Sequence, residues 1–363
     1  MRSIGMIGFA GVVLVASAAC GSAGGGGKTS QATSPGEAGV DIPEAGQVSV
    51  DAGAVEDGGA SPTFLAHFDK SQGQLPEGLW QQQGTPVVGW APLATLLEVA
   101  ADGTTQPLGT AGVAANTFAL GIVSGPDGTL YFGVGAASAV GGAPASAAPV
   151  TPAPGIYSLP ADGGSAQVFS LGSDANPPML FANGLAFQGN DLFVADSEGV
   201  IYEIDGSGTA TVWSQDSELS ASQPACAGVV PLAVGANGIV VTATDIFVTN
   251  TNYGRLLDFP IQDDGTAGAV TVIAEDCATL AGADGLVQDD DGSFLIAVNA
   301  QNRIARVTPS GAISVLAEGA PLDTPASVLI DTTTGAKRLL FTNSSFFSAA
   351  DAGAPGLLAL PLP

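Results

Sequence analysis

From Ser61 onward, apolar and polar residues alternate in short runs that are separated by Gly- or Asp-containing turns. A period of two residues is typical of β-strands, and no stretch of this region keeps the 3.6-residue period of an amphipathic helix. The segment that begins at Asn183 shows the unit clearly, because NGLAFQG, DLFVADS, VIYEID and TATVWS are four consecutive strand-like runs. The pattern therefore predicts an all-β domain over residues 61–363.

The four-strand unit recurs along the chain. Equivalent units begin at or near Glu77, Leu120, Asn183, Asn237, Asp284 and Ala326. Repeats of about 40–50 residues with four strands each indicate the blades of a β-propeller. The last unit has only three strands, and residues 63–69 form a strand-like run with no unit of their own, so we predict that this run closes the ring. The sequence thus predicts a six-bladed β-propeller with four antiparallel strands per blade.

The first 60 residues have a different composition. Residues 1–20 combine a basic start, an apolar run and small residues before Cys20, as in a secretory signal peptide. The end of this segment resembles a lipobox that would be lipidated at Cys20, but Ser17 stands where that motif usually has Leu, so secretion without lipid remains an alternative. Residues 21–60 lack aromatic residues and predict a flexible tether. We therefore expect an exported, membrane-anchored lipoprotein of the cell envelope.

The charge balance limits the partners. The chain carries 34 acidic and 8 basic residues, a net charge of −26. The negative electrostatic potential of such a chain repels nucleic acid and anionic lipid surfaces. We therefore expect no nucleic-acid partner, a membrane contact only through the N-terminal lipid, and a monomer.

Oxygen-bearing side chains recur at the start of four units. In a propeller the first strand of each blade faces the central axis, so Glu77, Asn183, Asn237 and Asp284 should meet at one mouth of the channel, whereas Leu120 and Ala326 are apolar. Calcium prefers carboxylate and amide oxygens. The alternative is that these residues only cap a turn before the following Gly. Two carboxylates buried without a cation would be costly, which favours Ca²⁺ or another divalent cation.

The order of these phrases resembles a known superfamily. PEGLW, ANGLAF, GANGIVV and GADGL follow one another as in the calcium-dependent six-bladed propellers: gluconolactonase and senescence marker protein, diisopropyl-fluorophosphatase and the paraoxonases. The resemblance covers residues 61–363 and implies that Glu77, Asn183, Asn237 and Asp284 are metal ligands and that the substrate is a lactone or phosphotriester. An Arg that helps bind sugar lactones in the gluconolactonases has no identifiable counterpart.

Asp284 is the best candidate for a catalytic base or nucleophile, beside an ion that polarises a substrate carbonyl. The one histidine, His67, falls on the closing strand and is interpreted as a packing residue. Second strands end at the same mouth. Their last polar residues are candidates for contact with a small-molecule substrate, with strand-end turns as the alternative: Asp196, Asn250, Asn299 and Asn343. A lactonase- or esterase-type hydrolase is the first hypothesis. A non-catalytic envelope propeller of the NHL type, or a scaffold with structural calcium, is the alternative.

Two cysteines remain besides Cys20. Cys226 and Cys277 each precede the first strand of neighbouring blades and would pair in an oxidising compartment. Two buried free thiols are the alternative. The second blade also carries an Ala/Pro-rich insertion at 136–155, on the side where it could cover the mouth.

Overall fold

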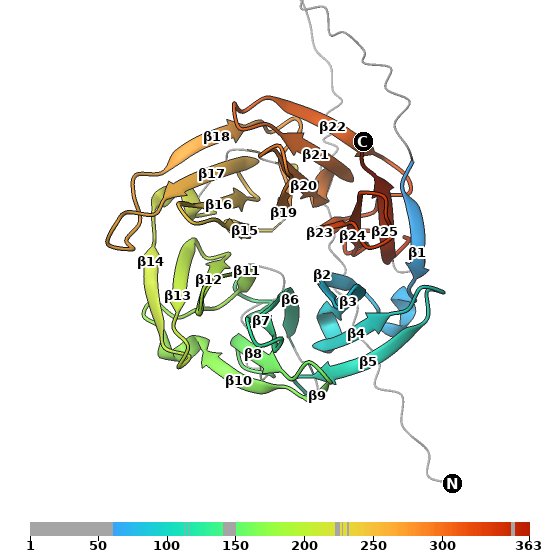
Figure 1. Ribbon diagram of the computed structural model, residues 1–363, viewed down its shortest axis with the longest axis horizontal. Coiled ribbons are helices and arrows are strands. Elements are labelled where there is room, and N and C mark those ends of the chain that lie inside the picture. The colour runs from blue at the N-terminus through green and yellow to red at the C-terminus, as the bar shows by residue number, and fades with distance from the viewer. Residues whose placement is uncertain are drawn as a thin grey trace, which may run out of the picture. The chain divides into compact units, whose positions relative to one another are not determined.

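The computed structural model describes residues 61–112, 114, 116–140, 150–221, 226, 228–230, 232–349 and 353–363. The predicted signal peptide, Cys20 and the tether lie outside these residues. Across the described residues, 25 strands form six sheets around a central axis (Figure 1). The predicted six-bladed β-propeller is confirmed.

Each blade follows the same antiparallel order from the axis outward. Blade 1 contains β2 (Pro76–Gln82), β3 (Thr85–Trp90), β4 (Thr95–Val99) and β5 (Thr105–Thr110). Blade 2 contains β6 (Thr117–Ser124), β7 (Leu130–Ala136), β8 (Gly155–Leu159) and β10 (Gln167–Leu171). Blade 3 contains β11 (Ala182–Gln188), β12 (Asp191–Asp196), β13 (Val200–Ile204) and β14 (Ala210–Ser214).

The second half of the ring repeats this order. Blade 4 contains β15 (Ala236–Val241), β16 (Asp245–Asn250), β17 (Arg255–Pro260) and β18 (Thr271–Glu275). Blade 5 contains β19 (Ala283–Gln288), β20 (Phe294–Val298), β21 (Arg303–Val307) and β22 (Ile313–Glu318). Blade 6 contains β23 (Pro325–Asp331), β24 (Arg338–Asn343) and β25 (Gly356–Pro361), with β1 (Thr63–His67) as its outer strand.

Strand β1 closes the ring as the sequence predicts. It pairs antiparallel with β25, with Thr63 opposite Ala359 and His67 opposite Gly356. The His67 ring stacks on Phe64 at 4.0 Å between centroids, which fits its interpretation as a packing residue. One further strand was not predicted: β9 (Gly164–Ser165) pairs in parallel with β5 and ties the outer edge of blade 1 to the chain of blade 2.

The core lies between neighbouring sheets. One cluster joins Phe193 and Ile201 of blade 3 to Ile246 and Phe259 of blade 4, and equivalent clusters join the other blades. The alternation that predicts the strands also places these side chains on the sheet faces, where burial stabilises the ring. No helix among the described residues is long and apolar enough to span a membrane.

Candidate metal centre

Each first strand contains a β-bulge at the position of the proposed ligand. The pairing with the second strand shifts between Ala182 and Gly184 in β11 and between Ala236 and Ile239 in β15, and the other four blades shift at the same place. A bulge leaves one residue unpaired in the ladder and redirects its side chain. The bulges therefore free Asn183, Asn237 and their counterparts from the regular alternation of the strand.

The Gly after each ligand position serves a close approach between blades rather than a turn. Gly184 lies inside β11 without a positive φ, and an added Cβ would be 2.3 Å from the carbonyl oxygen of Asn237 in the next blade. An added Cβ at Gly121 would be 2.3 Å from the carbonyl oxygen of Asn183, and one at Gly238 would be 2.5 Å from the carbonyl oxygen of Asp284. Side chains do not fit at these distances, so glycine is required for the ring to close. The turn interpretation of these Asn-Gly and Asp-Gly pairs is therefore wrong.

Hydroxyl groups support the proposed ligands from the second strands. Asn183 Nδ2 donates to Ser197 Oγ at 3.3 Å, and Asn237 Nδ2 donates to Thr251 Oγ1 at 2.9 Å. Ser197 and Thr251 donate in turn to carbonyl oxygens at the start of the next blade's first strand. Because each amide nitrogen has a hydroxyl partner, its Oδ1 remains an available acceptor.

In blade 6 Ser344 has the same role for Glu77, because its Oγ donates to Glu77 Oε2 at 3.1 Å and also bonds Pro76 O. The supporting hydroxyls were not predicted from the sequence. Each is the Ser or Thr that follows the polar end of the second strand, in an Asp-Ser, Asn-Thr or Asn-Ser pair.

The two carboxylates are buried, and the charge of Asp284 opposes the ionisation of Glu77. Glu77 is 6% exposed and Asp284 is 4% exposed. Burial raises the pKa of Glu77 well above its usual value, and the charge of Asp284 raises it further, while the Ser344 hydrogen bond lowers it. Burial also raises the pKa of Asp284, against hydrogen bonds from Asn299 and Asn237. Among the described residues, no lysine or arginine contributes to either shift.

This donor set fits a hard divalent cation. Two carboxylates and two amide oxygens match the ligands that calcium prefers. A cation would offset the burial that raises both carboxyl pKa values and the repulsion that raises the pKa of Glu77 further. No group of three or more His, Cys, Asp or Glu side chains is found in the described part of the chain, because amides supply half of this set. Leu120 and Ala326 occupy the equivalent positions in blades 2 and 6, where both are buried.

The four strand-end residues divide into two kinds. Asn299 Nδ2 donates to Asp284 Oδ2 at 2.8 Å, so this residue belongs to the site. Asp196 accepts from the backbone N–H groups of Phe181 and Glu198. Asn250 donates to the Glu218 and Ser220 carbonyls, and Asn343 does the same for Pro321 and Ala354. These three hold the connections between blades, as the strand-end alternative expects.

An apolar cluster flanks the ligand positions where the chain enters the first strands. Leu120, Val140, Phe181 and Val234 are buried together, and Phe118 packs against them. Val140 belongs to the insertion between β7 and β8, and its carbonyl accepts from Ala233 N. The first residues of the insertion therefore pack beside the site, whereas 141–149 lie outside the described residues.

A disulfide joins Cys226 and Cys277, whose Cα atoms are 5.2 Å apart. It is the pairing that the sequence predicts. The bridge links the connections that lead into β15 and β19, which carry Asn237 and Asp284. Two neighbouring blades are thus covalently tied near two of the proposed ligands.

No protein-family model matches the chain, and no curated protein sequence matches it either. Solved structures with similar folds include a gluconolactonase from Xanthomonas campestris, at 17% identity and TM-score 0.59, covering 84% of this chain and 90% of that one. The chain shares the propeller fold of these enzymes. The calcium-binding protein regucalcin from Agrobacterium tumefaciens is similar at 14% identity and TM-score 0.57, over 83% of this chain and 93% of that one.

A virginiamycin B lyase from Staphylococcus aureus is also similar, at 14% identity and TM-score 0.51, over 84% of this chain and 99% of that one. At these identities the comparisons show a common fold. A lactonase, a calcium-binding protein and a lyase share it, so function has to be argued from the site.

Proposed function

We propose that this protein is a calcium-dependent hydrolase of a lactone or related ester, with the ion held by Glu77, Asn183, Asn237 and Asp284. The observation that carries the proposal is the pair of buried carboxylates, Glu77 and Asp284, whose pKa values burial raises and which lie beside two amide oxygens without a lysine or arginine partner among the described residues. The gluconolactonase and regucalcin folds support a metal-dependent lactonase among the chemistries that the fold hosts.

The chain's own residues would supply the proton transfer and the orientation. When bound, calcium would polarise the substrate carbonyl as a Lewis acid. Asp284 would accept the proton of the attacking water, because it is the carboxylate fixed by Asn299 on one oxygen. Water would add to the carbonyl carbon, the ester C–O bond would break, and the leaving oxygen would take up a proton to give a hydroxy acid.

The surroundings of the site favour a substrate with an apolar substituent. Phe118, Phe181 and Leu120 form an apolar cluster beside the ligands, and Phe118 and Phe181 meet edge to face at 6.3 Å. Such a wall offers few hydrogen bonds to a polyhydroxylated sugar ring, and the sequence has no counterpart of the sugar-binding Arg. We therefore propose an alkyl- or aryl-substituted lactone or ester rather than a sugar lactone.

Turnover of aliphatic lactones, aryl esters and phosphotriesters by the purified full chain tests the proposal, with calcium and with a chelator. Calcium-dependent turnover that is lost in Asp284→Asn and retained in Leu120→Ala is the expected result. A calcium-raised melting temperature without turnover of any of these substrates would contradict the hydrolase and favour the structural-calcium scaffold.

We also propose that the protein is exported and lipidated at Cys20. The Cys226–Cys277 disulfide supports an oxidising compartment. Mass spectrometry of the mature N-terminus should find a lipid on Cys20, and Cys20→Ser should release the protein from the membrane fraction. An unmodified N-terminus beyond residue 20 would indicate plain secretion instead.

A further inference from the structure

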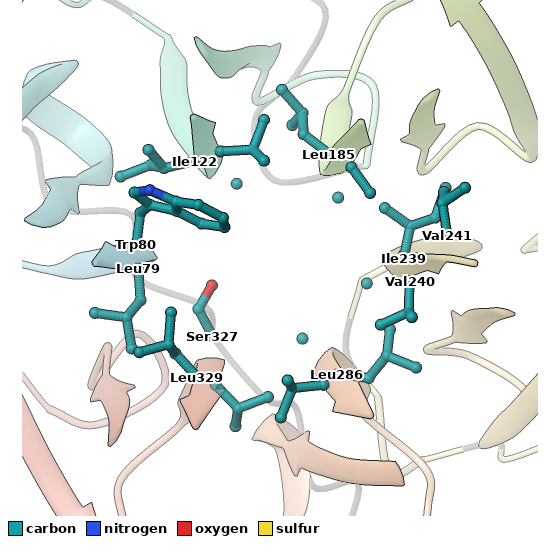
Figure 2. A pocket seen from close by; sticks show the side chains of 18 of the residues that line it. Leu79, Trp80, Ile122, Leu185, Ile239, Val240, Val241, Leu286, Ser327 and Leu329 are labelled. Carbon is teal, nitrogen blue, oxygen red and sulfur yellow. The ribbon is translucent and has the colours of Figure 1, made fainter. Parts of the chain in front are cut away.

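The central channel contains an apolar chamber beyond the proposed metal ligands. A cavity of about 440 Å³ lies between the first strands of all six blades, on the side toward which these strands run after the ligand position (Figure 2). Its lining starts at Gly184, Gly238 and Gly285, directly after three proposed ligands, and at Gly121, directly after Leu120 at the equivalent position of blade 2. The chamber is therefore coaxial with the candidate metal centre and distinct from it.

Two layers of apolar side chains form its wall. The first layer comes from the second residue after each ligand position: Leu79, Ile122, Leu185, Ile239, Leu286 and Val328. These side chains keep 5–9% exposure. The second layer comes from the next residue of each strand: Trp80, Val123, Ala186, Val240, Val287 and Leu329. Figure 2 shows Trp80, Leu185 and Ile239 reaching into the opening.

Polar side chains at the wall are few and those near the rim are already paired, whereas the axis-facing edge of each first strand offers backbone N–H and C=O groups. Among the described residues that line the chamber, hydroxyl groups come from Ser124 and Ser327, and none carries a charge. Gln81 Nε2 donates to Asp331 Oδ1 at 3.0 Å, and Gln188 Nε2 donates to Thr242 O at 2.7 Å. Asp331 also forms an ion pair with Arg338 at 2.7 Å. A charged ligand would find no unpaired counter-charge here.

Apolar walls of this size favour an apolar occupant. The side chains of the wall are apolar, and each Å² of their surface that a bound molecule shields from water contributes roughly 25 cal/mol to binding. The volume falls in the range of pockets for small molecules. Six strands enclose the space, so a flat protein surface does not fit. The net charge of −26 disfavours an anion further.

We propose that this chamber is a second binding site, which takes an uncharged, mainly apolar small molecule that packs against the Trp80 indole. The site does not depend on the hydrolase proposed above. Its ligand is an aliphatic or aromatic compound recognised by shape and apolar contact, because the wall offers the hydroxyls of Ser124 and Ser327 and no charge among the described lining residues.

Titration of the purified full chain with the neutral fluorescent probe N-phenyl-1-naphthylamine tests the site. We expect saturable binding of one probe per chain. Leu329→Asp places a charge in the second layer and should weaken binding at least about tenfold, since a buried unpaired carboxylate is costly. The matched control is Val315→Asp on the outer strand β22, where Val315 is 40% exposed, and it should bind as the wild type does.

Tryptophan emission gives a second readout that does not require Leu329→Asp to fold. Probe bound beside Trp80 should quench its emission, so Trp80→Phe should lose most of the probe-dependent quenching. Trp213→Phe should retain it, because Trp213 lies on the outer strand β14 and bonds Gly265 O. Absence of saturable binding, or equal quenching loss in the two variants, would overturn the proposal.

A last variant separates the chamber from the apolar cluster beside the metal centre. Phe118→Ser should leave probe binding unchanged. Probe binding that disappears in Phe118→Ser and persists in Trp80→Phe would place the probe in that cluster and refute the chamber as a site. Loss of calcium-dependent turnover has no bearing on this outcome, so the two proposals fail independently.

Discussion

The same six strands present two different chemistries at the two ends of their axis-facing stretch. At the ligand positions, Glu77, Asn183, Asn237 and Asp284 are polar and buried, and hydroxyls from the second strands support the first three. Two residues further on, every blade presents an aliphatic side chain to the chamber. Because a strand advances about 3.3 Å per residue, this change takes only about 7 Å. The buried polar side chains at the first end are held by hydrogen bonds, some of which cross between blades. The aliphatic side chains at the second end are held by packing alone.

Loss of the disulfide should have the largest effect on stability, and it should affect the two ends of the strands differently. Cys226 and Cys277 are separated by 51 residues, and the chain-entropy relation gives a stabilisation of about 4 kcal/mol for such a loop. The double variant Cys226→Ser/Cys277→Ser should lower the urea midpoint accordingly and weaken calcium binding, since the bridge lies at the ligand end. Probe binding in the chamber should persist at low denaturant. An unchanged midpoint would contradict the bridge as a stabilising element.

Gly184→Ala should break the packing between the first strands of blades 3 and 4, which carry Asn183 and Asn237. Its Cβ would be 2.3 Å from the Asn237 carbonyl oxygen, which belongs to the backbone of the next blade, so the blades must separate. We expect about 3 kcal/mol of destabilisation in urea unfolding. Gly206→Ala is the control, because nothing lies within 4 Å of its added Cβ. Equal stability of the two variants would refute the close-approach explanation.

At the chamber end, Arg338→Met should cost about 2 kcal/mol because it leaves the Asp331 carboxylate buried without its ion-pair partner. Although burial opposes it, hydrogen bonds from Thr333, Gln81 and Arg338 hold the pKa of Asp331 at about 2. Arg303→Met is the control. Its partner Glu318 is 62% exposed, so that ion pair contributes little. Thermal unfolding at pH 7 compares the stability of the two variants. Equal losses of stability would contradict a stabilising ion pair between Arg338 and the buried Asp331.

The last effect is gradual, a pH dependence of stability from Asp196 at the end of the strands that carries the proposed ligands. Burial raises its pKa from the ordinary 3.8 to about 6, against backbone hydrogen bonds from Glu198 and Phe181. The folded state therefore binds this proton more tightly than the unfolded state. The stability that this proton contributes is complete below pH 3.8 and is lost as pH rises toward 6, by about 1 kcal/mol per pH unit. Asp196→Asn should remove that slope in urea titrations between pH 4 and 6. An unchanged slope would assign it to other groups.

The sequence alone predicts the blade count, the ring closure by residues 63–69 and the Cys226–Cys277 pair, because each follows from a repeat pattern or a position within a repeat. It does not predict why Gly follows each proposed ligand. The close contact of Gly184 with Asn237 O joins two blades that are separate in the sequence, so no local pattern encodes it.

The sequence does not predict the roles of the strand-end residues either. Asp196 and Asn299 occupy the same kind of position, yet Asp196 bonds a connection and Asn299 bonds Asp284. The difference depends on how each connection folds back, which three-dimensional packing decides. The sequence does not predict the chamber, although its first layer recurs in every repeat, because branched apolar residues in a strand indicate core as readily as cavity.

Calorimetric titration of the full chain with calcium tests the central claim, that Glu77, Asn183, Asn237 and Asp284 form one metal site. We expect one ion per chain in the wild type, a similar affinity in Leu120→Ala, and a loss of at least about tenfold in Asp284→Ala, which removes one of the two proposed ligand carboxylates. Calcium binding of equal strength in Asp284→Ala and the wild type, or no binding by the wild type, would contradict it.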